Sequence, residues 1–432
     1  MELNKGEFIV LVIGFVLLQL CLLGSANVVF QVQHKFAGKE KPLTEFKAHD
    51  SQRHRRILSA VHLPIGGDSN PTSAALYFSK IRIGTPGKDY MVQVDTGSDL
   101  LWVNGAGCQK CPRKSDHGAS RPLYDPKAST TAKIVSCDQG ICSSILKGAT
   151  GNCKVGTRCS YSVNYGDGSS ATGYFVRDIV QLDRVSGDLQ TTSMNGSIAF
   201  GYGSQQSGEL GSSEQPLDGM LGFGQADSSM LSQLASAKKV KKIFSHCLDG
   251  SKGGGIFTIG EVVYPKVKTT SMSHTEHYNV ELKEIQVGAD VLQLPKDLFG
   301  VGTNQGTIID SGTTLAYLPD LAYKQLIKKD QEWCIGFQDS NLQTKDGKEI
   351  TLLGDVVLTD KLVTYDVEKK TIGWIEHKCS STIKVKDEES RKVYTVRGDK
   401  LSHSSRVHTS SGIHMACFFF VMSITFINPR LN

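Results

Sequence analysis

Short runs in which apolar and polar residues alternate fill the chain from about Leu76 to Cys379, and glycine or proline separates one run from the next. The first run continues to Ile83 and ends at the turn residues Gly84 and Pro86. Alternation with a period of two is typical of strands that bury one face. Amphipathic helical stretches do not alternate with these runs, which argues against a parallel α/β sheet. The pattern predicts an all-β body.

An apolar run lies at the N-terminal end, outside this body. Phe8 to Leu23 is almost unbroken apolar sequence, and the small residues Gly24, Ser25 and Ala26 follow it. This pattern indicates a secretory signal peptide over residues 1–26. A single transmembrane anchor is the alternative, but the run is short for a membrane span.

The C-terminal end combines a polar segment with an apolar one. Residues 381–412 are rich in charged and small residues and are predicted to form a polar spacer before the tail 413–432, which contains the apolar run Ile413 to Ile427. Small residues, a spacer and an apolar tail are similar to a GPI-attachment signal. A retained transmembrane helix is the alternative, although the run is short and contains His414. We expect a secreted protein, or one held by a lipid anchor on the extracellular face of the plasma membrane.

The net charge of +5 is unevenly distributed. Residues 27–62 hold seven Lys or Arg against three Asp or Glu, residues 380–432 hold eight against four, and the body between them is slightly acidic. A basic surface that would bind nucleic acid is therefore not expected. The basic segment 27–62 lacks strand periodicity, so it is either a solvated linker or a propeptide that covers an acidic body at neutral pH.

One tetrapeptide pattern occurs twice, about half a chain apart. In each copy an apolar strand leads to an aspartate on a glycine turn, as Asp95-Thr96-Gly97-Ser98 and as Asp310-Ser311-Gly312-Thr313. The hydroxyl residue three places after each aspartate can hydrogen-bond back to it. Each copy is followed by an apolar-apolar-glycine element, Met220-Leu221-Gly222 or Leu352-Leu353-Gly354. Such a repeat predicts two similar lobes, each presenting one aspartate to a shared cleft.

On these motifs the chain resembles the pepsin-like aspartic proteases, and more closely their plant nepenthesin-type branch, over about residues 75–380. The resemblance implies a bilobal all-β fold with a central cleft, an N-terminal lobe over 63–260 and a C-terminal lobe over 261–380. It implies an aspartic endopeptidase that is a monomer, with polypeptide substrates, no cofactor and no metal. It also favours the propeptide over the linker for residues 27–62.

The catalytic pair implied by this resemblance is Asp95 and Asp310. Like charges close together cannot both ionise cheaply, so two facing carboxylates share one proton over an acidic range. The ionised member takes a proton from water while the protonated member donates one to the substrate carbonyl. Ser98 and Thr313 are expected to hold the carboxylates by hydrogen bonds. The turns are expected to be supported by Thr96, Gly97, Ser311 and Gly312.

The glycine-rich segment 163–173 has the residues of a hairpin turn. An ordinary surface hairpin is one interpretation. The family resemblance implies instead a flap that closes over bound peptide, with Tyr165, Gly166 and Asp167 at its working edge. Asn195 begins an Asn-Gly-Ser sequon, and we expect it to be glycosylated on the secretory route.

Nine of the 11 cysteines lie in the body. The Cys108/Cys111 spacing is shared with zinc sites, but the secretory route favours disulfides. The resemblance implies a nested pairing within the Cys-rich insert, with Cys137 joined to Cys159 and Cys142 joined to Cys153. It further implies the pairs Cys108–Cys111 and Cys247–Cys379. Cys334 is left without a partner in the sequence.

The second half of the repeat is short. Asp95 lies 127 positions before Gly222, whereas Asp310 lies only 44 positions before Gly354. A helix-like segment ending at Lys329 is followed directly by sequence typical of late strands, so we expect strands to be missing near 329/330. Lost strands would expose edges and apolar faces. The alternatives to an active enzyme are therefore an inactive truncated isoform and a binding or inhibitory relative of the same fold.

Overall fold

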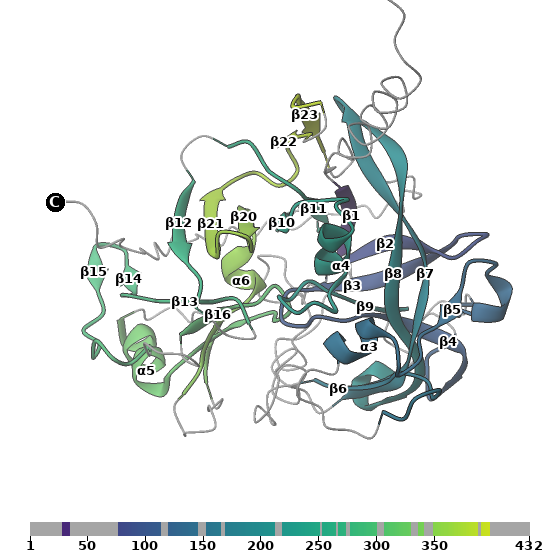
Figure 1. Cartoon of the computed structure of the whole chain (residues 1–432). Coiled ribbons are helices and arrows are strands. Elements are labelled where there is room, and N and C mark those ends of the chain that lie inside the picture. The colour runs from purple at the N-terminus through teal and green to yellow at the C-terminus, as the bar shows by residue number, and fades with distance from the viewer. Residues whose placement is uncertain are drawn as a thin grey trace, which may run out of the picture.

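The structure is a computed structural model that describes residues 28–34, 77–113, 120–145, 153–165, 169–211, 218–250, 253–264, 267–273, 277–299, 306–329, 336–340, 349–387 and 390–397. Strands dominate these residues, and the predicted all-β class is confirmed (Figure 1). The longest helix among them, α5, has 10 residues. Strand β2 shows why the alternating pattern was informative, because Tyr77, Ser79, Ile81 and Ile83 are buried while the residues between them are not.

The strands are β1 (Val28–His34), β2 (Tyr77–Ile83), β3 (Lys88–Asp95), β4 (Leu101–Gln109), β5 (Lys133–Ile134), β6 (Ser160–Asn164), β7 (Ser170–Gly187), β8 (Gln190–Ser207), β9 (Gly219–Gly222), β10 (Ile243–Leu248), β11 (Gly255–Ile259), β12 (Lys268–Ser271), β13 (Asn279–Val280), β14 (Gln286–Val287), β15 (Asp290–Val291), β16 (Thr307–Ile309), β17 (Ala316–Leu318), β18 (Phe337–Asp339), β19 (Thr351–Leu353), β20 (Lys361–Asp366), β21 (Thr371–Glu376), β22 (Ile383–Lys386) and β23 (Val393–Val396). The helices are η1 (Pro126–Ala128), α3 (Gly140–Ile145), η2 (Gly208–Gly211), α4 (Met230–Ser236), α5 (Asp320–Lys329) and α6 (Asp355–Leu358).

One large sheet of 14 strands contains strands from both halves of the chain. Its order is β12-β21-β20-β10-β11-β1-β2-β3-β9-β4-β8-β7-β5, with β6 paired to β7. The link between the halves is β10, which pairs with β11 on one side and with β20 on the other. A separate five-stranded sheet, β13-β16-β19-β17-β18, belongs to the second lobe. In Figure 1 the strands of the first half and the green strands near α5 form two separate groups.

The predicted duplication is visible in the strand pairing. In the first half, β9 runs parallel to β3 and antiparallel to β4. In the second half, β19 runs parallel to β16 and antiparallel to β17. In each half, the strand that leads to the aspartate therefore lies beside the strand that leads to the downstream glycine. The same three-strand arrangement is built twice from similar sequence.

The basic segment 27–62 contains a strand that the sequence pattern did not indicate. Strand β1 lies between β11 and β2, with Val32 opposite both Gly255 and Ser79. The expectation that this segment lacks strand structure is wrong for residues 28–34. Its backbone groups complete the hydrogen bonding between β11 and β2, and the alternation Phe30-Gln31-Val32-Gln33 is too short to stand out in a basic segment.

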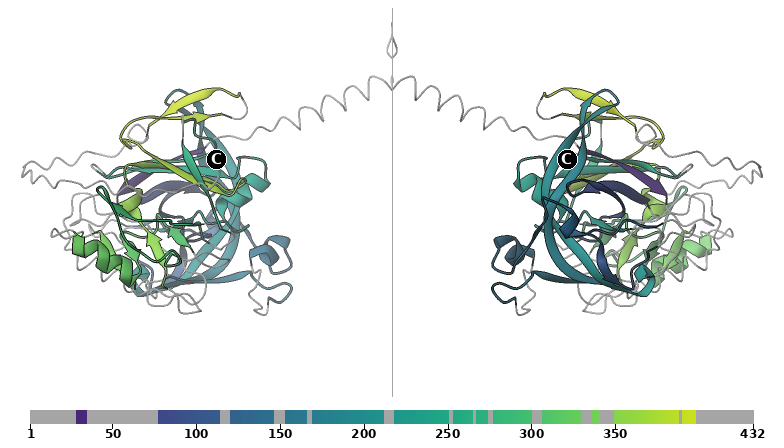
Figure 2. Two further views of the ribbon diagram at one scale, coloured as in Figure 1. Left: turned by 90° about the vertical axis from the view of Figure 1, so that its left-hand side faces the viewer. Right: turned by 90° about the vertical axis from the view of Figure 1, so that its right-hand side faces the viewer.

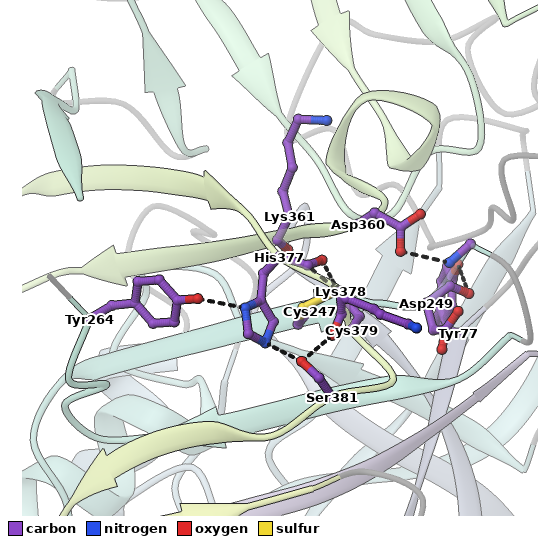
Figure 3. The surroundings of a disulfide bond; sticks show 11 residues. Tyr77, Cys247, Asp249, Tyr264, Asp360, Lys361, His377, Lys378, Cys379 and Ser381 are labelled. Carbon is purple, nitrogen blue, oxygen red and sulfur yellow. Dashed lines mark hydrogen bonds between the residues drawn. A yellow bond between two sulfur atoms is a disulfide. The ribbon is translucent and has the colours of Figure 1, made fainter. Parts of the chain in front are cut away.

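The late part of the chain is joined to β10 by the Cys247–Cys379 disulfide (Figure 3). Next to it, Tyr264 Oη lies 2.8 Å from His377 Nδ1, and Ser381 Oγ lies 3.0 Å from His377 Nε2. Burial lowers the pKa of His377 below its usual value. These contacts fix the direction in which the chain leaves β21.

Beyond this disulfide, β22 and β23 form a hairpin inside the range predicted as a polar spacer, 381–412. Ile383, Val385 and Val396 are buried in one apolar cluster with the disulfide. The hairpin meets the turn between β7 and β8, where the Leu189 amide donates to the Thr395 carbonyl at 2.7 Å. Figures 1 and 2 show it at the tip of the long β7–β8 ribbon. The ordered body therefore extends past the predicted boundary at 380, and the tail 413–432 lies outside the described residues.

Aromatic side chains fill the core where β10, β11 and β20 meet. The Phe244 and Tyr365 rings are stacked with centroids 4.4 Å apart, and Phe223 and Phe257 pack beside them. Burial of such rings is a large favourable contribution to folding.

Among the described residues, no helix is long and apolar enough to cross a membrane.

Candidate active site

The first motif lies at the end of β3. Asp95 is paired in register with Gly222 of the parallel strand β9 and is fully buried. Its backbone carbonyl accepts a 2.7 Å hydrogen bond from the Phe223 amide, and its Oδ1 accepts a 2.9 Å hydrogen bond from the Gly97 amide. The strand fixes the backbone of Asp95 from one side, and the glycine turn orients its carboxylate from the other.

The second motif repeats this geometry at the end of β16. Asp310 is also fully buried, and its amide donates to the Leu353 carbonyl at 3.0 Å. The Gly312 amide donates to Asp310 Oδ1 at 2.6 Å, and the Thr313 hydroxyl donates to Oδ2 at 3.1 Å. The expected hydrogen bond from Thr313 is therefore present.

The two motifs touch each other directly. Thr96 Oγ1 accepts a hydrogen bond from the Ser311 amide and another from the Ser311 hydroxyl, each at 3.0 Å. Thr96 follows Asp95 and Ser311 follows Asp310 in the chain. The structure thus brings together two loops that are 215 positions apart in the sequence.

The corresponding hydroxyl in the first motif behaves differently. Ser98 is buried, and its Oγ has no hydrogen-bond partner within the described part of the chain. The hydrogen bond expected from Ser98 to Asp95 is absent, so that expectation is wrong for this structure. Ser98 instead acts through its backbone, because its carbonyl accepts a 2.7 Å hydrogen bond from the Gly224 amide.

Comparisons with known proteins agree with this geometry. The family model described as xylanase inhibitor N-terminal matches residues 77–261, and the one described as xylanase inhibitor C-terminal matches residues 277–332. The chain is 45% identical over 418 aligned positions to aspartic proteinase 36 of Arabidopsis thaliana, covering 84% of this chain and 86% of that protein. The chain belongs to the pepsin-like aspartic protease family.

A second relative and two solved structures are also similar to this chain. Aspartic proteinase 39 of Arabidopsis thaliana is 42% identical, covering 94% of this chain and 95% of that protein. The crystal structure titled edgp aligns with a TM-score of 0.55 at 18% identity, covering 74% of this chain and 95% of that one. Basic 7S globulin from soybean aligns with a TM-score of 0.54 at 18% identity, covering 74% of this chain and 97% of that one. At these identities the two structures show a shared fold.

Two details of these comparisons bear on the prediction that a segment is missing from the second half of the chain. The alignment with aspartic proteinase 39 runs over 462 positions, more than the 432 residues of this chain, so the relative has residues without a counterpart here. The C-terminal family model stops matching at residue 332. That point is close to the predicted junction at 329/330, just after α5.

The segment predicted as a hairpin and flap, residues 163–173, joins β6 to β7, and the hairpin is confirmed because Asn164 pairs with Ser170. Tyr165 is buried, and its hydroxyl accepts a 2.6 Å hydrogen bond from the Trp102 indole N–H. Its amide donates to the Ser169 carbonyl at 2.9 Å. Gly166 and Asp167 lie outside the described residues, so their predicted role in the flap stays a prediction.

The disulfide pairing corrects one expectation. Cys137 is joined to Cys153, and Cys142 is joined to Cys159. The nested pairs expected from the family resemblance, Cys137 with Cys159 and Cys142 with Cys153, are therefore wrong. The reason is burial, because Cys142 and Cys159 both lie in an apolar cluster under the insert, whereas Cys137 and Cys153 are more exposed. The pairs Cys108–Cys111 and Cys247–Cys379 are confirmed.

Two further residues singled out in the sequence are Asn195 and Cys334. Asn195 is exposed on β8 opposite Gln181, so its side chain is accessible. Cys334 lies outside the described residues.

Sequence reasoning missed two buried polar residues near the motifs, Tyr365 and His246. Asp310 and Asp355 are the charged groups that face the Tyr365 side chain. His246 Nε2 lies 3.0 Å from the Tyr365 hydroxyl. A Tyr and a His inside apolar strands look like core residues in a sequence, so no local signal distinguishes them. Burial raises the pKa of Tyr365 well above its usual value, which keeps its hydroxyl protonated.

Proposed function

We propose that the chain is an aspartic endopeptidase in which Asp95 and Asp310 activate one water molecule. The observation that carries the proposal is the contact between Thr96 and Ser311, which joins the two aspartate loops. Each aspartate is held in a buried turn by a glycine amide. The relatives named aspartic proteinases at 42–45% identity support the same function.

Both carboxylates accept hydrogen bonds in their turns. Asp310 accepts from the Gly312 amide and the Thr313 hydroxyl, and Asp95 accepts from the Gly97 amide. Two nearby carboxylates share a proton, because a second negative charge would be strongly repelled. The ionised group takes a proton from water, and the protonated group donates one to the carbonyl oxygen of the scissile peptide. Hydrogen bonds to a carboxylate favour its charged form, which is the form that the base needs.

Substrate would lie against the segment that begins at Tyr165. The hydrogen bond from Trp102 ties this residue to β4, the strand that follows the first motif. We propose that residues 165–167 form the edge of a flap over bound polypeptide, and that the enzyme acts as a monomer without a cofactor.

The N-terminal segment 27–62 fits a propeptide that is removed for activity. Strand β1 is paired with β11 and β2, so its removal would break two rows of backbone hydrogen bonds. A basic segment is attracted to a slightly acidic body at neutral pH. Protonation of body carboxylates would weaken this attraction and favour release in acid.

We further propose a secretory route for this chain. It rests on the signal-like residues 1–26, the four disulfides and the exposed Asn195 as a glycosylation site. The GPI-like tail after residue 412 would hold the enzyme on the extracellular face of the plasma membrane, unless the protein is secreted outright. Nepenthesin-2 of Nepenthes gracilis is 30% identical over 63% of this chain and 59% of its own length, in support of the nepenthesin-type branch.

A second candidate is a binding or inhibitory relative with little activity. It is favoured by the xylanase inhibitor descriptions of the matching family models and by the second half, which we infer to lack a segment after α5. An inactive truncated isoform would share this feature. The presence of both aspartates in paired loops favours the enzyme.

Incubation of the purified protein with an unfolded polypeptide between about pH 3 and 6 tests the proposal. The proposal expects cleavage that a transition-state inhibitor of aspartic proteases blocks. A protein that is folded by its near-UV circular dichroism but shows no inhibitor-sensitive cleavage would defeat the enzyme and favour the binding relative.

A further inference from the structure

The hairpin of β22 and β23 is fixed at one end of the long β7–β8 ribbon. The Leu189 amide donates to the Thr395 carbonyl at 2.7 Å, and the Thr395 amide donates to Asp188 Oδ1 at 2.7 Å. Two hydrogen bonds in opposite directions thus hold the hairpin against the β7–β8 turn. We call this part of the molecule the ribbon tip, which consists of residues 186–190, 383–387 and 390–397.

The outer face of the hairpin combines apolar and basic side chains. Lys384 is paired in register with Thr395, and Lys386 is paired with Val393. Directly opposite residues of an antiparallel pair point to the same side, so these four side chains share one face. Val393 is 44% exposed, and Lys384 is exposed beside it. This face points away from the buried cluster that the inner face of the hairpin joins.

The turn of the ribbon adds a second apolar side chain. Leu189 is 40% exposed and has a φ of 55°. Glycine and asparagine adopt this left-handed conformation more easily than leucine does. Val263, whose amide donates to the Lys384 carbonyl at 2.8 Å, is exposed as well. Three of the eight large apolar side chains that the described residues expose therefore lie at or beside the ribbon tip.

Basic residues are in excess around these apolar side chains. Residues 383–397 contain five Lys or Arg against three Asp or Glu, and one of the acidic residues, Asp387, is buried and paired with Arg184. Arg391 and Lys392 are exposed at the start of β23. Apolar side chains flanked by lysine and arginine suit the headgroup layer of a bilayer, where cations meet lipid phosphates and apolar groups reach the acyl chains.

The chain leads from this surface toward the predicted anchor. The described residues end at Arg397, directly after β23, and 15 residues separate Arg397 from Ile413, where the apolar tail begins. A segment of that length spans at most roughly 50 Å. A bilayer that holds the tail is therefore close to the ribbon tip. Such tethering raises the effective concentration of the lipid surface, so a small contact surface is sufficient for binding.

We propose that the ribbon tip docks against the bilayer that holds the C-terminal tail. Leu189 and Val393 enter the headgroup layer, and Lys384 lies beside lipid phosphates. The inference rests on the membrane anchoring proposed above and does not depend on protease activity.

Docking at the ribbon tip holds the flap end of the molecule away from the bilayer. Strand β7 begins at Ser170 beside the flap and ends at Gly187 beside the hairpin, and a strand of 18 residues spans up to about 55 Å. Figure 1 shows β6 and the β22–β23 hairpin toward opposite ends of the ribbon. Tyr165, which follows β6, is thus directed toward soluble polypeptides rather than toward the membrane.

Tryptophan quenching tests the contact at single residues. The full chain with a C-terminal histidine tag is held on vesicles of phosphatidylcholine, phosphatidylserine and nickel-chelating lipid, with or without brominated acyl chains. The tag supplies an anchor that does not depend on how a cell processes the tail. Leu189→Trp and Val393→Trp should each add fluorescence that brominated lipid quenches, measured against the parent chain as background.

Val155→Trp is the matched control, because Val155 is 83% exposed in the Cys-rich insert near the flap. Its fluorescence should be the same with and without bromine. Equal quenching at all three positions, or at none of them, would overturn the proposal.

An asparagine at position 189 separates lipid contact from stability. Leu189→Asn removes the apolar side chain and suits the left-handed backbone, so the melting temperature should stay the same or rise. With Val393→Trp as the reporter, quenching should fall as expected for a docking equilibrium weakened about 5- to 10-fold. Ile134→Thr, at a similarly exposed position on β5, should leave the reporter unchanged. Unchanged quenching in Leu189→Asn would contradict the assigned contact.

The outcomes distinguish a failure of docking from a failure of anchoring. If the tethered chain shows no quenching at the ribbon tip, docking is refuted even when the untagged chain sediments with the membranes of secreting cells. If the untagged chain does not sediment with those membranes, the anchoring proposal fails, and the tethered vesicles still decide whether the ribbon tip binds lipid.

Discussion

Thr96 Oγ1 accepts two hydrogen bonds from Ser311, one from its amide and one from its hydroxyl, each at 3.0 Å. This contact joins loops that follow Asp95 and Asp310 in the two halves of the chain. A hydrogen bond between residues 215 positions apart is strong evidence of long-range organisation, because it requires both halves to fold and meet. The direct contact between the two aspartate loops therefore runs through a single oxygen atom.

Replacing that oxygen should be more harmful than removing one of its donors. Thr96→Val keeps the shape of the side chain but leaves the Ser311 amide and hydroxyl without their acceptor. Ser311→Ala removes the hydroxyl and keeps the amide hydrogen bond. We expect losses in unfolding free energy of about 2–4 kcal/mol for Thr96→Val and about 1 kcal/mol for Ser311→Ala, measured by chemical denaturation. Equal effects of the two variants would contradict this assignment of the contact.

The downstream glycines should also be intolerant of a side chain. A Cβ at Gly354 would collide with the backbone carbonyl oxygens of Thr313 and Leu315, next to the second motif. Gly354→Ala should therefore cost more than about 3 kcal/mol and reduce activity. Gly140→Ala is a matched control because nothing lies within 4 Å of the added atom. Similar melting temperatures for the two variants would show that β19 does not pack against the second motif this closely.

Stability should change with pH because of Asp218. Burial raises the pKa of this carboxyl from 3.8 to about 6, although the hydrogen bond from the Met91 amide and the charge of Arg121 oppose the increase. The folded state holds the proton more tightly than the unfolded state. The resulting stabilisation is complete below the unfolded pKa of 3.8 and is lost as the pH rises through about 6.

Asp218→Asn isolates this effect, because the amide oxygen can still accept from Met91 while the titration is removed. We expect the variant to gain on the order of 3 kcal/mol over the wild type between pH 4 and 7. Urea denaturation at the two pH values measures the difference. An unchanged gap between the two proteins across this range would show that Asp218 does not titrate as described.

Peptide mapping without reduction tests the disulfides. We expect linked peptides that contain Cys137 with Cys153 and Cys142 with Cys159. Recovery of Cys137 linked to Cys159 would restore the pairing expected from the family resemblance. The Cys247–Cys379 link serves as an internal control, because the pair implied by the family resemblance is also the pair in the structure.

Local chemistry explains which features could be predicted from the sequence. The aspartate turns, the strand class and the Cys108–Cys111 pair are encoded by neighbouring residues, so their patterns are readable. The pairing inside the Cys-rich insert was missed because both connectivities close short loops, and burial of Cys142 and Cys159 decides between them. Strand β1 and the β22–β23 hairpin were missed because they are stabilised by distant segments, namely β11 and the β7–β8 turn.

The contact between His246 and Tyr365 could not be predicted for a related reason. His246 and Tyr365 are 119 positions apart, and each stands in an apolar strand. Only the pairing of β10 with β20 brings the His246 ring to 3.0 Å from the Tyr365 hydroxyl. Ser98 illustrates the converse case, since its position in the motif suggested a hydrogen bond to Asp95 that the structure does not contain.

Cleavage by single and double aspartate variants tests the central proposal most directly. Asp95→Asn, Asp310→Asn and the double variant are compared with Asp297→Asn, an exposed aspartate outside the motifs. If the two carboxylates act as one unit, each single variant loses at least about 1,000-fold in kcat, the double variant is no worse, and Asp297→Asn remains active. Substantial inhibitor-sensitive cleavage by either single variant would contradict a shared role of Asp95 and Asp310.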